Sequence, residues 1–427
     1  METNLSKGKI NKTGESIRQS LLKKENISNE DLSYLQLYRT SFREPLKVAN
    51  EELNRIMKII DKSGVITYRV KRIESIFSKL LRFQTMDLAR MHDIAGARCI
   101  LTNEKKVIAF VEEIKKSKIL TIKDVDDYIS NPKETGYKSI HLRCLCEDKY
   151  IEIQVRDDTQ HSWATLVEIT DVIYKTKIKE NSDDKGTGLY TFLQLFSKSK
   201  NLTSDERATI NKVLIKTKFI QKLTNTFNKN AIILRNNWCK KEPKEGQFYI
   251  FEVDKKNNPN ITIFKDFVTA EEQYFSTFTK DILVKEKNLV MAYISDDDFE
   301  LISKAYSNYV LIKHNFYLKL ASILNNDSHD TKVNKQSLKL LKLCILNNYL
   351  VHISELNILI NTRNNYNKKY ADWKKSLTQE IKAIPLSLKK NQKLNAFDFT
   401  YFKVRVKLFF IEFKVNHYLK HGIRNIK

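Results

Sequence analysis

Glycine and proline are scarce in this sequence, with nine and five residues in a chain of 427. This scarcity argues against low-complexity linkers and favours a helix-rich chain. Cysteine is also scarce, and none of the five cysteines has the spacing of a zinc site, although Cys144 and Cys146 lie two apart. We therefore expect reduced cysteines in a cytoplasmic protein.

Long apolar runs are missing as well. The first residues contain no apolar segment of the kind found in a signal peptide. No run approaches the roughly 18 apolar residues that a membrane-spanning helix requires. The sequence therefore predicts no membrane partner, while its 41% of apolar residues is enough to build the cores of two or three domains.

Acidic residues are too few to balance the basic ones. Lys and Arg number 75 against 51 Asp and Glu, which gives a formal net charge of +24. A charge of this sign favours a polyanionic partner, nucleic acid above all. Residues 331–427 hold 20 Lys and Arg and 5 Asp and Glu, so +15 of the net charge lies there. Two interpretations of that segment stay open: a surface for tRNA or other RNA, or an oligomerisation bundle with a solvated exterior.

Hydrophobic periodicity divides the chain into four regions. Residues 1–29 are expected to form a polar, frayed N-terminal tail, and residues 30–200 the main domain. Residues 201–325 are expected to form a helical connector and a small α+β accessory domain, and residues 326–427 a basic helical region. The predicted fold class is α/β (α+β), with a mixed sheet flanked by helices.

The main domain is predicted to alternate helices with strands. Helices are expected at residues 30–63 and 68–82, a buried strand at 97–101 and a further helix at 104–117. The helix predicted at 68–82 carries a polar stripe of three cations and a hydroxyl, namely Arg72, Ser75, Lys79 and Arg82. Such a stripe is usually a solvated face, but its composition also suits a polyphosphate.

Residues 131–156 end in a strand with two unlike faces, because strand side chains alternate from one face to the other. The apolar face consists of Ile151, Ile153 and Val155, and the polar face of Glu152, Gln154 and Arg156. An acid, an amide and a guanidinium in line are costly to bury without a ligand or partners. A half-solvated antiparallel strand is the alternative interpretation.

Two separated features accompany this strand: Asp93 at the mouth of the strand at 97–101, where Gly96 permits close backbone approach, and a turn with Gly136 and Tyr137. Together they make the sequence resemble the RelA/SpoT synthetase domain of the alarmone pyrophosphokinases. The matching motifs are Arg69-x-Lys71, Ser75-x-x-x-Lys79, DIAGAR at 93–98, DYISNPKETGYKSIH at 127–141, EIQVR at 152–156 and QHSWA at 160–164. The resemblance covers roughly residues 40–180, and the phrase KAYSNYVLI at 304–312, similar to one in a subgroup of the family, extends it to about residue 320.

The resemblance implies a nucleotidyltransferase-like fold and transfer of the β,γ-pyrophosphate of ATP to a ribose 3′-hydroxyl, usually of GDP or GTP. It implies that Asp93 and Glu152 hold Mg²⁺, and that Glu152 takes up the proton of the hydroxyl. The implied ATP-binding residues are Arg69, Lys71, Ser75, Lys79 and Arg98. The implied acceptor-binding residues are Lys133, Tyr137, Ser139, His141, Gln154 and Arg156. Taken singly, each has an ordinary structural alternative, such as a turn cap for Asp93.

The sequence also departs from the family. About 40 residues precede the region of resemblance, too few for the hydrolase domain of the long members, so we expect no alarmone hydrolysis. Glu168 stands where many short synthetases have histidine, which weakens the transfer of roles around it. Two alternative functions stay open: a toxin that pyrophosphorylates the 3′-terminal adenosine of tRNA, and a non-catalytic nucleotide- or RNA-binding regulator. The expected protein partner is an antitoxin or, in a homo-oligomer, another copy of the chain.

Overall fold

The structure is a computed structural model. It describes residues 5–71, 73–178, 184–198, 202–220, 222–223, 247–253, 259–280 and 288–294, together with residues 320 and 323. The chain divides into two compact units, and each is described by itself. The first unit takes the described residues within Met1–Lys133, Lys138–His161 and Pro243–Tyr306, and the second those within Glu134–Tyr137, Ser162–Glu242 and Ser307–Lys427.

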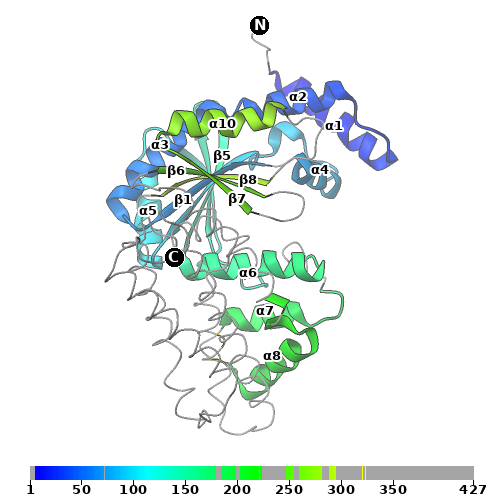
Figure 1. Ribbon diagram of the computed structural model, residues 1–427, viewed down its shortest axis with the longest axis vertical. Coiled ribbons are helices and arrows are strands. Elements are labelled where there is room, and N and C mark those ends of the chain that lie inside the picture. Colours follow the sequence, from blue (N-terminus) through cyan, green and yellow to red (C-terminus); the bar gives the residue numbers. More distant parts are fainter. Residues whose placement is uncertain are drawn as a thin grey trace, which may run out of the picture. The chain divides into compact units, whose positions relative to one another are not determined.

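A mixed eight-stranded sheet forms the centre of the first unit (Figure 1). Its strands are β1 (Val65–Val70), β2 (Ala95–Leu101), β3 (Thr121–Asp127), β4 (Ile140–Cys146), β5 (Lys149–Asp157), β6 (Gln247–Val253), β7 (Pro259–Phe264) and β8 (Asn288–Ile294). They follow the order β3-β4-β5-β2-β1-β8-β6-β7. The β2–β5 pair is parallel, whereas β1–β2 and β4–β5 are antiparallel. The mixed sheet flanked by helices confirms the predicted fold class.

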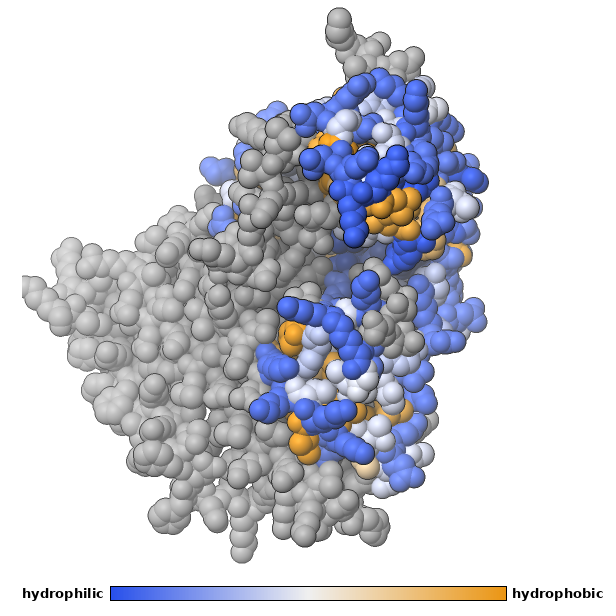
Figure 2. All heavy atoms as spheres, turned by 90° about the vertical axis from the view of Figure 1, so that its right-hand side faces the viewer, coloured by the Kyte–Doolittle hydropathy of each residue, from blue (hydrophilic) through white to orange (hydrophobic). Residues whose placement is uncertain are grey.

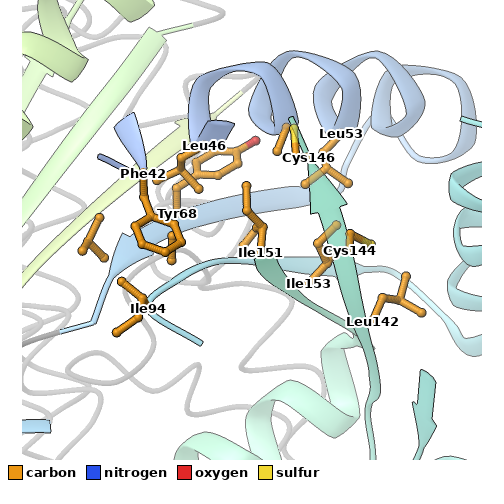
Figure 3. Packing of buried hydrophobic residues seen from close by; sticks show 14 of the residues in the cluster. Phe42, Leu46, Leu53, Tyr68, Ile94, Leu142, Cys144, Cys146, Ile151 and Ile153 are labelled. Carbon is orange, nitrogen blue, oxygen red and sulfur yellow. The ribbon is translucent and has the colours of Figure 1, made fainter. Parts of the chain in front are cut away.

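Helices cover the apolar face of this sheet. Helices α3 (Arg43–Ile60) and α5 (Glu104–Lys115) pack against β2 and β5, and α10 (Phe267–Lys280) packs against β6, β7 and β8 (Figure 1). Figure 3 shows side chains of α3 and of the strands in one buried layer, among them Leu46, Leu53, Tyr68, Ile151 and Ile153. Because strand side chains alternate, Glu152 and Gln154 lie on the opposite face, as predicted for this strand.

The N-terminal segment is helical and packed, which corrects the prediction of a frayed tail at residues 1–29. Helix α1 (Lys7–Lys23) begins with a cap in which the Ser6 side chain accepts a hydrogen bond from the Lys9 backbone. Ile10 and Ile17 are buried, and their seven-residue spacing places them on one face of the helix. These buried residues and the hydrogen bond from the Arg18 side chain to the carbonyl oxygen of Leu80 hold the helix, which the polar composition of the segment did not indicate.

Two further predictions in this region need correction. The helix expected at 30–63 is interrupted after α2 (Asn29–Thr40), and α3 follows it. The helix expected at 68–82 is strand β1 followed by α4 (Ile73–Arg82), with the short helix η1 (Leu88–Arg90) beyond it. The segment Val65–Val70 pairs with β2 on one side and β8 on the other, and this pairing outweighs the helical spacing of its apolar residues. Arg69 therefore lies on a strand, and Arg72 is outside the described residues.

The accessory domain expected within residues 201–325 does not stand apart in the structure. Strands β6, β7 and β8 form as predicted around a hairpin and a helix, but β8 pairs with β1, so they extend the central sheet. The edge of β1 offered unpaired backbone groups that these strands satisfy. The helix predicted at 296–306 and the basic region 326–427 lie outside the described residues.

The second unit has a helical core of its own. Helix α6 (Asp158–Tyr174) runs into it from the first unit, followed by α7 (Leu189–Lys198) and α8 (Ser204–Thr217). Trp163 is buried, as predicted, and donates from Nε1 to the carbonyl oxygen of Leu193 over 3.2 Å. Phe192 and Phe219 pack edge to face in the same core. This unit also contains the loop segment Glu134–Tyr137.

The surface of the described residues is mostly hydrophilic in the view of Figure 2, with separate small hydrophobic groups. Exposed apolar side chains such as Leu22, Ile59 and Ile108 come from different helices. Scattered apolar residues of this kind are ordinary on protein surfaces. Across the part of the chain that the structure describes, no helix combines the length and the apolar character needed to cross a membrane.

Candidate functional site

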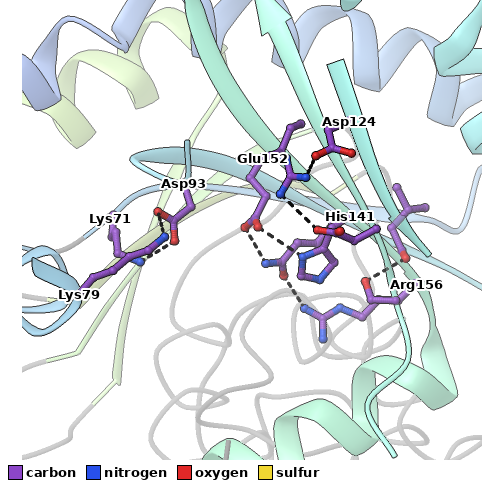
Figure 4. Close-up of polar contacts among 12 residues, drawn as sticks. Lys71, Lys79, Asp93, Asp124, His141, Glu152 and Arg156 are labelled. Carbon is purple, nitrogen blue, oxygen red and sulfur yellow. Dashed lines mark hydrogen bonds and ion pairs between the residues drawn. The ribbon is translucent and has the colours of Figure 1, made fainter. Parts of the chain in front are cut away.

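The end of β1, helix α4 and the loop before β2 bring two lysines onto one carboxylate (Figure 4). Nζ of Lys71 lies 2.7 Å from Oδ2 of Asp93, and Nζ of Lys79 lies 2.9 Å from Oδ1. The backbone of Lys71 is fixed by a hydrogen bond to the carbonyl oxygen of Ile94 at 2.7 Å. Three residues that are up to 22 positions apart in sequence thus form one charged group.

Electrostatics in this group favour an ionised Asp93. Burial raises the pKa of Asp93, but the charges and hydrogen bonds of Lys71 and Lys79 outweigh it, and the pKa lies below its ordinary value. Burial, together with the charges of Lys79 and Arg69, lowers the pKa of Lys71 more than Asp93 raises it. Two cations share one acid here, so the group carries a net positive charge that a phosphate can compensate.

A second polar group surrounds Glu152 on β5 (Figure 4). Gln154 donates from Nε2 to Oε2 of Glu152 over 2.9 Å, and Nδ1 of His141 lies 3.3 Å from Oε1. Arg156 in turn donates to Oε1 of Gln154 over 2.9 Å. Burial raises the pKa of Glu152, yet the contacts with His141 and Gln154 and the charge of Arg69 lower it to about 2. The carboxylate is therefore ionised at neutral pH.

The register of the sheet explains how the two groups become neighbours. Gly96 on β2 pairs with Glu152 on one side and with Arg69 on the other. A Cβ atom at Gly96 would lie 2.8 Å from the backbone oxygen of Glu152, so only glycine fits this pair. Arg98, two residues on, pairs with Gln154. The predicted ATP residues Arg69 and Arg98 therefore lie on the same face of the sheet as Glu152.

Four of the six predicted acceptor residues lie on β4 or β5 or directly before β4, and they make different contacts. His141 and Gln154 contact Glu152 directly. Ser139 is fully buried and donates to the carbonyl oxygen of Val155 over 3.1 Å, so its hydroxyl supports the β4–β5 pairing. Arg156 is 2% exposed and reaches Gln154.

The other two acceptor residues lie on the loop between β3 and β4. Nζ of Lys133 lies over the ring of Tyr128, 4.5 Å from its centroid, and the same ring meets His141 edge to face at 5.3 Å. Tyr137 belongs to the second unit, where its ring centroid is 6.5 Å from that of Trp163.

Ser75, the remaining predicted ATP residue, lies one turn before Lys79 on α4, so both side chains share a helical face.

Sequence reasoning missed Arg143 and Tyr128. Arg143 pairs with Glu152 across β4 and β5, and its guanidinium contacts Asp124 and Asp126 of the edge strand β3. The alternation of β4 placed Arg143 on the polar face with His141, and this signal was available in the sequence. The role of Tyr128 depends on its contacts across the loop, which no local pattern indicates.

The carboxylates of Asp93 and Glu152 are the type of ligand that Mg²⁺ prefers. Both are hard oxygen donors with lowered pKa values, and proteins hold Mg²⁺ through one or two carboxylates plus water and phosphate oxygens. Searched over the described ranges, the structure contains no group of three or more His, Cys, Asp or Glu side chains arranged for a metal. A cage made by protein alone is therefore not the type of site that these residues provide. Both oxygens of Asp93 accept from lysines, so an ion would share this carboxylate with them.

Comparison with known proteins finds relatives of the central part of this chain. Residues 68–179 match the model described as a region found in RelA / SpoT proteins. Over 111 residues the chain is 36% identical to the GTP pyrophosphokinase YwaC of Bacillus subtilis, covering 23% of this chain and 53% of that protein. It is 30% identical over 171 residues to a guanosine-3′,5′-bis(diphosphate) 3′-pyrophosphohydrolase of Borreliella burgdorferi, covering 36% of this chain and 26% of that one.

The chain thus spans about half of the length of YwaC and about a quarter of the length of the Borreliella burgdorferi protein. Among solved structures, the small alarmone synthetase 1 from Bacillus subtilis matches 44% of this chain and 98% of its own, with 23% identity and a TM-score of 0.33. The region matched by the family model contains Asp93, Glu152 and the two lysines described above. Residues 68–179 of this chain are therefore similar to the region found in RelA / SpoT proteins.

Proposed function

We propose that this chain is a pyrophosphokinase that transfers the β,γ-pyrophosphate of ATP to the 3′-hydroxyl of a ribose, with GDP or GTP as the acceptor. The main support is the arrangement of two ionised carboxylates, with Asp93 held by Lys71 and Lys79, and Glu152 next to Gly96 on the neighbouring parallel strand. Phosphoryl and pyrophosphoryl transfer depends on positioning and on charge neutralisation, which these groups can supply. The match of residues 68–179 to the RelA / SpoT model supports the same chemistry.

On the donor side, the phosphates of ATP would bind Lys71 and Lys79 alongside Asp93. Each lysine has three donors and can keep its contact with Asp93 while it binds a phosphate oxygen. Ser75 follows the same face of α4 and would add a hydroxyl. Arg69 and Arg98 would stack on adenine, because a planar guanidinium can lie against a ring.

Asp93 and Glu152 would hold Mg²⁺. When bound, the ion supplies neutralisation of phosphate charge and a fixed orientation of the transferred group. The residues of the chain contribute the ionised state of both carboxylates, which the lysines secure at Asp93 and the contacts with His141 and Gln154 secure at Glu152.

On the acceptor side, Glu152 would take up the proton of the 3′-hydroxyl. A carboxylate with a pKa of about 2 is ready to accept a proton but holds it weakly. Phosphates placed next to Glu152 would raise its pKa by charge repulsion, whereas Mg²⁺ held by the same carboxylate would lower it. Tyr137 would stack on the acceptor base, with Lys133, His141 and Gln154 among the polar groups that bind the acceptor.

The proposal is tested by incubating the purified chain with γ-labelled ATP, Mg²⁺ and either GDP or GTP. We expect label on the guanine nucleotide, and a rate lower by roughly a hundredfold or more in Glu152→Gln. Glu147→Gln is the matched control, because Glu147 lies exposed in the turn between β4 and β5. A wild-type rate in Glu152→Gln would contradict the proposed role of the carboxylate.

The net charge of +24 favours a second acceptor, the 3′-terminal adenosine of tRNA. The same assay decides between the two when deacylated tRNA replaces the nucleotide, since label then stays with the precipitated RNA. Transfer to tRNA and not to GDP or GTP would replace the acceptor while keeping the chemistry. Nucleotide binding without transfer to either acceptor would leave a non-catalytic regulator.

A further inference from the structure

The loop segment Glu134–Tyr137 is held by helix α7, which lies beyond the region matched by the family model. This segment is the tip of the connection between β3 and β4, and it carries the ring proposed to stack on the acceptor base. Its contacts within the second unit fix both its backbone and the surroundings of that ring.

Gln194 of α7 makes the first of these contacts. It donates from Nε2 to the backbone carbonyl oxygen of Glu134 over 2.9 Å. Gln194 is half-buried and Glu134 is exposed, so water can replace either partner. A solvent-accessible hydrogen bond of this kind adds little to global stability, and its main effect is to restrict the loop.

Ser197, one turn further along α7, makes the second contact. Gly136 has φ +88°, and a Cβ atom there would lie 2.1 Å from Oγ and 2.4 Å from Cβ of Ser197. The loop backbone therefore lies directly on the helix, at a position and in a conformation that glycine accepts. The Ser197 hydroxyl itself bonds the carbonyl oxygen of Gln194 at 2.7 Å, so it is fixed in place.

Trp163 connects the same helix to the ring of Tyr137. Its Nε1 donates to the carbonyl oxygen of Leu193, and its ring is inclined by 57° to that of Tyr137. Tyr137 is half-buried, so part of the ring is covered and part is open to a ligand. Helix α7 thus fixes the backbone of the loop segment Glu134–Tyr137. Through Trp163 it also limits the positions that the Tyr137 ring can take.

We propose that α7 sets the affinity of the enzyme for its acceptor, with Gln194 and Ser197 as positioning residues for Tyr137. The ligand class is a purine nucleotide whose base stacks on the tyrosine ring. This inference rests on the proposed function. It adds that a helix outside the matched family region decides how tightly the acceptor, and not ATP, is bound.

The test uses the full chain with Gln194→Met, which keeps the size of the side chain and removes the donor. We expect the KM for the acceptor, and its Kd measured by calorimetry without ATP, to rise roughly three- to tenfold. The KM for ATP should stay within about twofold, because the hydrogen bond acts on the acceptor loop alone. Thr191→Ala, an exposed change on the same helix, is the matched control and should alter neither constant.

A second set of variants tests the contact with Ser197. Gly136→Ala should weaken acceptor binding through the contact described above and the positive φ. Adding Ser197→Gly should restore part of the binding, because it removes the atoms that the new methyl group meets.

Equal changes in the two KM values for Gln194→Met, or an unchanged acceptor KM and Kd, would overturn the inference. So would the absence of any recovery in the double variant. A wild-type chain that transfers label to no acceptor would instead contradict the proposed function, so the two failures are distinguishable.

Discussion

Gln154 donates to Oε2 of Glu152 with its amide nitrogen and accepts from Arg156 with its amide oxygen, both over 2.9 Å. The two contacts fix the orientation of the amide, since a guanidinium can only donate. The nitrogen must then point at the carboxylate. Arg156, although 2% exposed, thereby acts on Glu152 through one intervening side chain.

Gln154→Met is expected to shift the pH dependence of the reaction. Burial raises the pKa of Glu152 and the hydrogen bond from Gln154 lowers it, so loss of the bond raises the pKa above its present value of about 2. The acidic limb of the profile of kcat/KM should therefore move to higher pH, whereas the change in pKa should not lower the rate at neutral pH, because Glu152 is ionised there in both proteins. Gln19→Met, on the exposed side of α1, is the control. An unchanged acidic limb would show that the amide does not tune the carboxylate.

Lys79→Ala is expected to raise the KM for ATP by about tenfold or more, because a charge-assisted hydrogen bond to phosphate contributes about 1.5–3 kcal/mol. The variant also leaves Lys71 as the remaining described cation bonded to Asp93. The measurement is initial rate against ATP concentration at saturating acceptor. Lys115→Ala removes a lysine that pairs with Glu112 on the exposed side of α5, and its KM should match the wild type. A similar KM for Lys79→Ala would argue that the lysine serves Asp93 alone.

The sequence carried enough information to locate the site strand and the carboxylates. The two-residue alternation of Ile151, Ile153 and Val155 is a local property, and the structure keeps it. The position of Asp93 before a glycine and a buried strand was equally readable. Neither pattern, however, reveals that two lysines share Asp93, because that depends on how β1, α4 and β2 meet in space.

Strand β1 shows why other parts of the fold could not be predicted from the sequence. Its neighbour β8 comes more than 200 positions later in the chain, and a partner so distant leaves no local trace. Without that partner, the apolar residues at 65–80 fit a helix as well as a strand. The packing of helix α1 was not predicted for a related reason. Ile10 and Ile17 stabilise the helix only when it packs against the rest of the first unit, and the local sequence does not reveal that packing.

Acid should weaken the fold through the same carboxylates. Burial raises the pKa of Glu152, but its partners lower it from 4.5 to about 2, and the pKa of Asp93 is lowered from 3.8. Their stabilisation is therefore present above these ordinary values and is lost as pH falls toward the folded-state values. Urea unfolding between about pH 6 and about pH 3 measures it. Glu152→Gln should lose less stability over this range than the wild type, whereas Glu147→Gln should follow the wild type. Parallel curves for Glu152→Gln and the wild type would contradict the linkage.

Tyr274→Phe tests how α10 supports the donor side of the site. The Tyr274 hydroxyl accepts a hydrogen bond from the backbone nitrogen of Val70 over 2.9 Å, at the buried end of β1 next to Lys71. Without the hydroxyl this N–H has no acceptor, so the free energy of unfolding should fall by about 1–3 kcal/mol. The KM for ATP should rise as well, because the end of β1 positions Lys71. Tyr34→Phe is the matched control, since the buried Tyr34 hydroxyl has no hydrogen-bond partner among the described residues. If both variants unfold at the same urea concentration and bind ATP equally, then α10 packs on the sheet without holding the site.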